Sequence, residues 1–201
     1  VAIACLALFI FFPSKGLSQD LSRTTFFLLI LPILYIKLVL KKKLKDFGAS
    51  LPISKQNLVW FLGALLASFI IMILLIKFTD FQKNYVIPDY IMASFWIFLL
   101  GELVVYNYFF FQLEAFFRGF VLFTFFPKLG YLSILAAVLF AYVFLYLSQS
   151  VSWGGVPYMI ATLTGTVVAY KTRSFIYSYF MGLLFIISVD AYLIYSFKSI
   201  S

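Results

Sequence analysis

The sequence predicts an all-α fold, a polytopic transmembrane helix bundle of about seven hydrophobic helices that forms one integral membrane domain over residues 1–201. Hydrophobic residues make up 65% of the chain and charged residues only 11%, whereas soluble domains contain about 45–50% and about 25%. Mean hydropathy is +1.09, and long apolar runs recur along the chain. This composition excludes a disordered chain and a water-soluble enzyme, because most of the surface must face lipid.

Three apolar runs lie in the N-terminal half. Residues 1–12 form a short run that ends before Pro13; we expect it to be the remainder of a span that starts before Val1, with a signal-peptide core as the alternative. Residues 24–40 come close to the length of about 20 residues that a helix needs to cross the hydrocarbon core. We expect a kink at Pro32. Residues 57–78 are long enough for one complete span.

Four apolar runs follow in the C-terminal half. Residues 91–126 are too long for one upright crossing, because a helix rises about 1.5 Å per residue and the core is about 30 Å thick. We expect this segment either to break or bend near residues 106–112 or to project beyond one interface. The remaining runs are residues 131–147, 156–170 and 175–197.

Loop charges predict the orientation of the bundle. The strongest basic loop, residues 41–55, contains the run Lys41-Lys42-Lys43-Leu44-Lys45 and should be cytoplasmic. Alternation then places the loops 77–89 and 149–155 outside, and it brings Lys128, Lys171 and Arg173 to the cytoplasmic side. The net charge of +8 therefore indicates a topology signal that also touches anionic lipid, and we expect no nucleic-acid partner.

Two residue types limit the chemistry. The chain has no His, so a metal site or proton shuttle built on imidazole is excluded, and we expect no metal and no cofactor. Its one cysteine, Cys5, has no partner within the chain for a disulfide bond.

Ionisable residues within the apolar runs need a specific reason, because each costs roughly 2.5–3.5 kcal/mol on insertion scales. Glu114 and Arg118 are four residues apart with the acid first, which favours an ion pair on one helix face. Asn107 lies two turns earlier on that face, and this polar stripe should face the bundle interior. The spacing leaves open whether the pair fixes helix packing or forms a functional site. For Glu102, rotated away from the stripe, and for Asp190 we expect interfacial snorkelling or one interhelical hydrogen bond.

Residues 112–120 read Gln-Leu-Glu-Ala-Phe-Phe-Arg-Gly-Phe. This segment resembles the first motif of the CPBP (Abi) family of intramembrane proteases, which includes the type II CAAX prenyl endopeptidases and bacteriocin-immunity proteins. The family pattern is Glu-Glu-x-x-x-Arg, usually continuing as Phe-Arg-Gly. Glu114 matches its second Glu and Arg118 its Arg, whereas Leu113 replaces its first Glu.

Two later segments extend the resemblance, which covers about residues 90–187. Phe140 matches the first residue of the family's second motif, Phe-x-x-x-His, and Phe144 stands where that motif has His. Gly165 and residues 170–175 are similar to a Gly-rich helix and the turn after it, and Gly182 stands where the family places another His. In its own right, Gly165 predicts a close approach of two helices.

The resemblance implies an intramembrane endopeptidase in which a Glu activates water while His and Asn or Asp side chains support it. Glu114 could be that base. Phe144 and Gly182, however, cannot donate the hydrogen bonds that a developing oxyanion needs. Side chains that could substitute for the missing donors are Asn107, Tyr142, Tyr146 and Gln149.

Three functional hypotheses follow. The first is a non-catalytic family member whose intramembrane cavity binds a membrane lipid or a membrane-embedded or prenylated peptide or protein. The second is an active intramembrane endopeptidase that uses Glu114 as general base. The third is a small transporter or channel with a path lined by Glu102, Asn107, Glu114 and Asp190. The missing His residues favour the first, and the absence of a recognisable internal repeat argues against the third.

Overall fold

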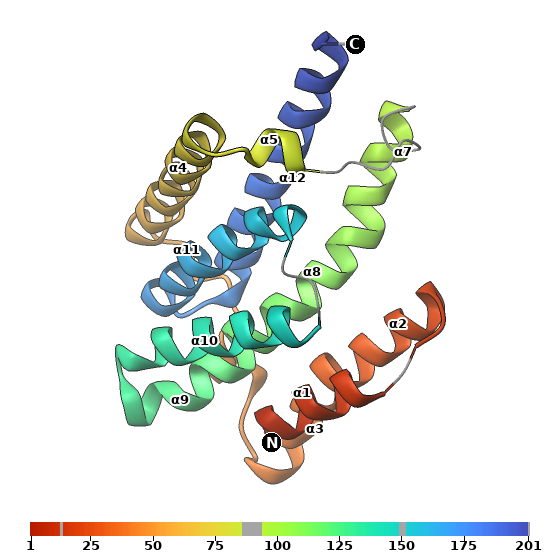
Figure 1. Cartoon of the computed structure of the whole chain (residues 1–201). Coiled ribbons are helices and arrows are strands. Elements are labelled where there is room, and N and C mark those ends of the chain that lie inside the picture. Colours follow the sequence, from red (N-terminus) through yellow and green to blue (C-terminus); the bar gives the residue numbers. More distant parts are fainter. Residues whose placement is uncertain (13, 86–93, 149–151, 201) are drawn as a thin grey trace.

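A computed structural model describes residues 1–12, 14–85, 94–148 and 152–200 of the chain (Figure 1). Every regular element within these ranges is a helix, which confirms the predicted helical bundle. Pro13, Gln149, the start of the apolar run 91–126 and parts of the predicted outer loops 77–89 and 149–155 lie outside the described residues.

Within the described residues, four helices are long and apolar enough to cross a membrane, and they support a membrane protein. They are Leu17–Val39, Lys55–Phe78, Trp96–Leu129 and Phe175–Ser196. The other predicted runs form helices of 10, 16 and 17 residues, which are shorter than the about 20 residues of a typical span. All seven apolar runs are thus helical in the described part of the chain, but helix length supports four spans there rather than seven.

The N-terminal region is a pair of helices packed side by side (Figure 1). The first is α1 (Ala2–Phe11). The second continues through Pro32, with short π-helical stretches on both sides of the proline. A proline lacks the backbone N–H of a regular turn, and π-helical turns shift the hydrogen-bond register to accommodate it. In order, its elements are α2 (Leu17–Thr24), η1 (Thr25–Ile30), α3 (Leu31–Leu34) and η2 (Tyr35–Val39).

The basic loop contains the short helix η3 (Leu44–Phe47) and leads to α4 (Lys55–Phe78) and α5 (Phe81–Asn84). Ser54 begins α4 with a hydroxyl that accepts a hydrogen bond from Asn57 N at 3.1 Å, the usual way to satisfy a free amide at a helix start.

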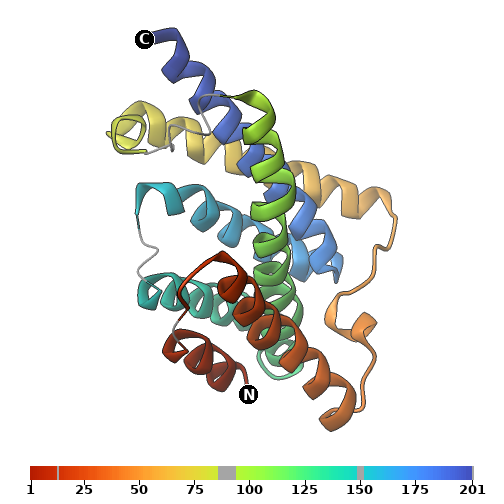
Figure 2. The same cartoon turned by 90° about the vertical axis from the view of Figure 1, so that its right-hand side faces the viewer.

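A long helix then runs through the middle of the bundle (Figure 2). It is helical without a break through residues 106–112, so the expected break there is wrong. The alternatives, a bend there or a projection beyond one interface, stay predictions. Two π-helical stretches change its register, one before and one after α8. Its elements are α7 (Phe95–Leu100), η4 (Gly101–Tyr106), α8 (Asn107–Glu114), η5 (Ala115–Val121) and α9 (Leu122–Leu129).

Three helices complete the fold: α10 (Leu132–Leu147), α11 (Val156–Thr172) and α12 (Phe175–Ile200), with a short helix η6 (Trp153–Gly155) before α11. Helix α11 is largely enclosed. It packs against α4, α10, α12 and the η5 part of the long helix, and most of its residues are buried. It therefore positions side chains against both the long helix and α12.

The basic loops meet at one end of the bundle. Phe175 N donates a hydrogen bond to Gly48 O at 3.2 Å, which ties the 41–55 loop to the turn between α11 and α12. The Arg173 guanidinium lies 3.6 Å from the centre of the Phe126 ring near the end of α9. The 41–55 loop, the end of α9 and the turn after α11 are thus neighbours; the predicted orientation of the bundle and the cytoplasmic location of these loops stay predictions.

Candidate functional site

Glu114 lies at the centre of the bundle, where α8 passes into η5. Its side chain is completely buried. One carboxylate oxygen, Oε1, forms an ion pair with Arg118 Nη1 at 3.1 Å, and the other, Oε2, accepts a hydrogen bond from Ser178 Oγ of α12 at 2.6 Å. The predicted pair therefore forms and faces the bundle interior, and α12 supplies a third member.

Arg118 extends the site to α11. Its guanidinium is also completely buried, and Nη1 donates a hydrogen bond to the Tyr158 hydroxyl at 3.3 Å. Within the described residues, Arg118 Nε and Nη2 have no hydrogen-bond partner, and the ion pair is the sole polar contact of Glu114 Oε1. The site thus holds one buried charge pair and three polar atoms that can still form a hydrogen bond.

Gly165 makes room for this arrangement. A Cβ atom at Gly165 would lie 2.4 Å from Ser178 Oγ and 3.4 Å from Met181 Cε. Helices α11 and α12 therefore approach closely at this glycine, which confirms the prediction from sequence. The close approach holds Ser178 against Glu114.

Further polar contacts extend from Glu114 along the side of the long helix that faces α12. Tyr179 of α12 donates a hydrogen bond to Asn107 Oδ1. Nearer the start of the long helix, Glu102 Oε2 is buried without a hydrogen-bond partner among the described residues, and a regular helix would turn Glu102 away from Asn107. The π-helical stretch η4 lies between these two residues, and residues five apart in a π-helix share a face.

Asp190 also has a partner from outside the spans. It accepts a hydrogen bond from the Tyr85 hydroxyl, which follows α5. Burial and the nearby Asp190 carboxylate raise the pKa of Tyr85 above its ordinary value. Asp190 therefore forms one hydrogen bond as predicted, but with a residue next to a short helix rather than with a neighbouring span.

The other residues suggested by the resemblance lie around the site rather than in it. Phe144 packs against Phe9 and Phe117, with ring centres 5.2 and 5.6 Å apart, and Phe140 packs against Phe125 at 5.8 Å. Both belong to the apolar packing of α10.

Gly182 lies one turn after Ser178 on α12. A Cβ atom there would come within 2.5 Å of Phe110 Cζ, so Gly182 accommodates an aromatic ring one turn before Glu114.

The predicted substitute donors have other partners or positions. Tyr142 donates its hydroxyl hydrogen to Met159 O at 3.0 Å, Asn107 binds Tyr179, and Tyr146 is 73% exposed. Gln149 lies outside the described residues. The hydroxyl groups that do reach the ion pair belong to Tyr158 and Ser178, which sequence reasoning missed, because single Ser and Tyr residues in apolar helices carry no spacing signal.

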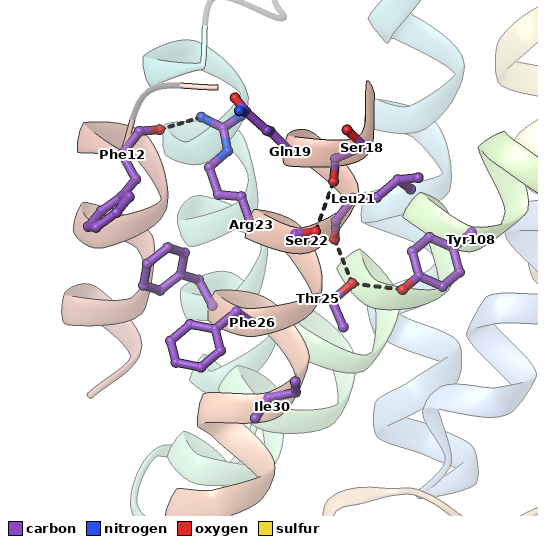
Figure 3. Close-up of a pocket in the computed structure, with 11 residues that line it drawn as sticks. Phe12, Ser18, Gln19, Leu21, Ser22, Arg23, Thr25, Phe26, Ile30 and Tyr108 are labelled. Carbon is purple, nitrogen blue, oxygen red and sulfur yellow. Dashed lines mark hydrogen bonds between the residues drawn. The ribbon is translucent and has the colours of Figure 1, made fainter. Parts of the chain in front are cut away.

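The opposite face of α8 borders an open pocket of about 940 Å³ (Figure 3). Thr25 and Tyr108 line it and share a hydrogen bond of 2.7 Å between their hydroxyls. Behind them, the buried Gln112 donates from Nε2 to Thr25 Oγ1 at 3.2 Å. Arg23, also in the wall, is already paired with Asp20 at 2.7 Å. This pocket lies on the other side of the helix from Glu114.

Chemically, the buried site offers one carboxylate, one guanidinium and two hydroxyl groups. Three or more potential metal ligands do not gather anywhere within the described ranges, and carboxylate with guanidinium is a self-neutralising pair rather than a cation cage. No family model, curated protein or solved structure matches the chain.

Proposed function

We propose that the chain is a non-catalytic integral membrane protein of the CPBP type, in which Glu114 and Arg118 organise the bundle and an intramembrane cavity binds a lipid or a prenylated or membrane-embedded peptide. The observation that carries this proposal is the complete burial of both side chains among three helices, with Glu114 held by Arg118 and Ser178. A general base must reach a water and a substrate, whereas Glu114 is completely buried, with Oε2 bound by Ser178 and Oε1 in the ion pair with Arg118.

The absence of the two expected oxyanion donors also favours a non-catalytic role. Loss of one oxyanion donor typically lowers kcat about 10²–10³-fold, and the residues at the two expected His positions are the apolar Phe144 and Gly182. Both fit apolar packing: Phe144 lies in an aromatic cluster, and Gly182 lies against Phe110. Partner binding, not hydrolysis, is the role that these substitutions favour.

An active intramembrane endopeptidase is the second candidate, favoured by Arg118 Nε, Arg118 Nη2 and Glu114 Oε1, which have no hydrogen-bond partner within the described residues. Donors and an acceptor side by side are the groups that peptide hydrolysis requires.

The experiment adds a farnesylated peptide with a C-terminal CAAX sequence to the purified protein in detergent. A non-catalytic binder should melt at a higher temperature with the peptide and leave the peptide intact. Cleavage by the unaltered protein but not by the Glu114→Gln variant would replace this proposal with the endopeptidase. No change in Tm with either the farnesylated peptide or an unmodified peptide would remove the prenyl-binding role.

A further inference from the structure

A partly open apolar cavity lies beside the basic loop. It has a volume of about 250 Å³ and is formed between the helix Leu17–Val39, the long helix, the basic loop and the start of α12. Its walls are almost wholly apolar. The lining includes Leu44, Phe47 and Ala49 from the loop and Ala115 from η5. In a bilayer, a lipid acyl chain is available to fill such an apolar cavity.

Positive charge is concentrated at the loop end of this cavity. Lys41, Lys42, Lys43 and Lys45 are all exposed, and Lys43 and Lys45 flank Leu44 of the cavity wall in sequence. Asp46 is the one acidic residue between positions 37 and 55, and its carboxylate is occupied by Lys43 N at 3.1 Å. The lysines are therefore exposed with little compensation from acidic side chains nearby in the sequence.

The loop that carries these lysines is fixed to the bundle. Its backbone accepts hydrogen bonds at Gly48 O from Phe175 N and at Ser50 O from the Ser174 hydroxyl. Gly48 adopts a φ of +78°, and a Cβ atom there would lie 2.5 Å from the Phe123 ring. The lysines and the cavity are thus held in a constant relationship, unlike charges on a loose linker.

We propose that this end of the bundle binds one anionic phospholipid from the surrounding leaflet, with an acyl chain in the apolar cavity and the headgroup phosphate against Lys43 and Lys45. A cavity next to positive charge fits both parts of such a molecule. Each lysine beside a membrane raises the affinity for anionic lipid about fivefold. The inference relies on the membrane location of the chain and is independent of whether Glu114 is catalytic.

The test measures which lipids the full chain retains. The purified protein is equilibrated in detergent with equal amounts of phosphatidylglycerol and phosphatidylcholine that carry the same acyl chains, and bound lipid is counted by native mass spectrometry. We expect phosphatidylglycerol to be retained at least about tenfold over phosphatidylcholine, given the contribution of each lysine. Equal retention of the two lipids would overturn the proposal.

Charge variants test the headgroup contact separately from the acyl-chain contact. The triple change Lys42→Gln, Lys43→Gln and Lys45→Gln should abolish the preference, and the corresponding arginine variant should keep it. A matched neutralisation elsewhere, K15Q/K77Q/K83Q, should have no effect. The proposal fails if the glutamine variant keeps the preference or if the matched variant loses it.

Filling the cavity tests the acyl chain. Ala115→Leu on the long helix and Ala49→Leu on the loop should each reduce the retention of both lipids, because the added side chain occupies the space. Unchanged retention in both variants would exclude the cavity as the binding site. These variants leave Glu114 and Arg118 in place. A negative result here would therefore contradict the phospholipid site without contradicting the function that the farnesyl-peptide experiment tests.

Discussion

Gly165 on α11 and Ser178 on α12 approach so closely that a Cβ atom on the glycine would lie 2.4 Å from the serine Oγ. The same Oγ donates the hydrogen bond to Glu114. Backbone packing and the polar site are therefore coupled through one atom, and a single methyl group at position 165 should disturb both.

Gly165→Ala should destabilise the protein by about 1–3 kcal/mol, the usual cost of forcing extra atoms into a packed core. Thermal unfolding in detergent measures this cost. Gly63→Ala is the control, because no atom lies within 4 Å of the Cβ position of Gly63. The double variant G165A/S178A should be no less stable than Ser178→Ala alone, since the colliding hydroxyl is gone; additive losses would contradict the proposed clash.

Gly182 should tolerate a side chain as poorly as Gly165. A Cβ atom there would lie 2.5 Å from Phe110 Cζ, and Phe110 is only 1% exposed, so its ring has little space to move. We expect Gly182→Ala to lower Tm, and Phe110→Leu to recover part of the loss when the two are combined. A Tm equal to that of the unaltered protein would show that the ring moves freely.

Tyr85 should make stability fall at alkaline pH. Its pKa is raised in the folded protein, whereas an unfolded tyrosine ionises near pH 10. A raised pKa gives stability that is complete below the unfolded value and is lost as pH rises above it. Tyr85→Phe lacks this ionisation, so its unfolding free energy should fall less steeply above about pH 10. If the unfolding free energies of the two proteins fell in parallel as pH rises, the burial of Tyr85 would be contradicted.

Much of the bundle could be predicted because hydropathy alone identifies apolar helices. The Glu114–Arg118 pair was predictable from its four-residue spacing, and the role of Gly165 from its position in an apolar helix. The number of spans was not, because an apolar run can form a helix too short to cross. Helix α11, for example, has 17 residues and most of them are buried inside the protein.

The partners of the pair could not be predicted from sequence. Ser178 and Tyr158 reach it through the packing of α12 and α11 against the long helix, and that packing leaves no periodic signal. Glu102 shows a second limit. A regular helical period turns it away from Asn107, but the π-helical stretch η4 restores a common face.

The central claim is that Glu114 and Arg118 form a buried pair that organises the bundle. A double-mutant cycle on unfolding free energy tests it, using Glu114→Gln, Arg118→Met and the combined E114Q/R118M variant. Each single change should cost about 3–5 kcal/mol, because it leaves the other charge buried without a partner. The exposed pair Asp80–Lys83, treated in the same way, should show no measurable coupling.

The direct measurement is therefore the coupling free energy between Glu114 and Arg118. We predict that E114Q/R118M is more stable than either single variant, because removing both charges leaves none unpaired in the apolar interior. A double variant whose loss equals the sum of the two single losses would contradict the pairing and the account built on it.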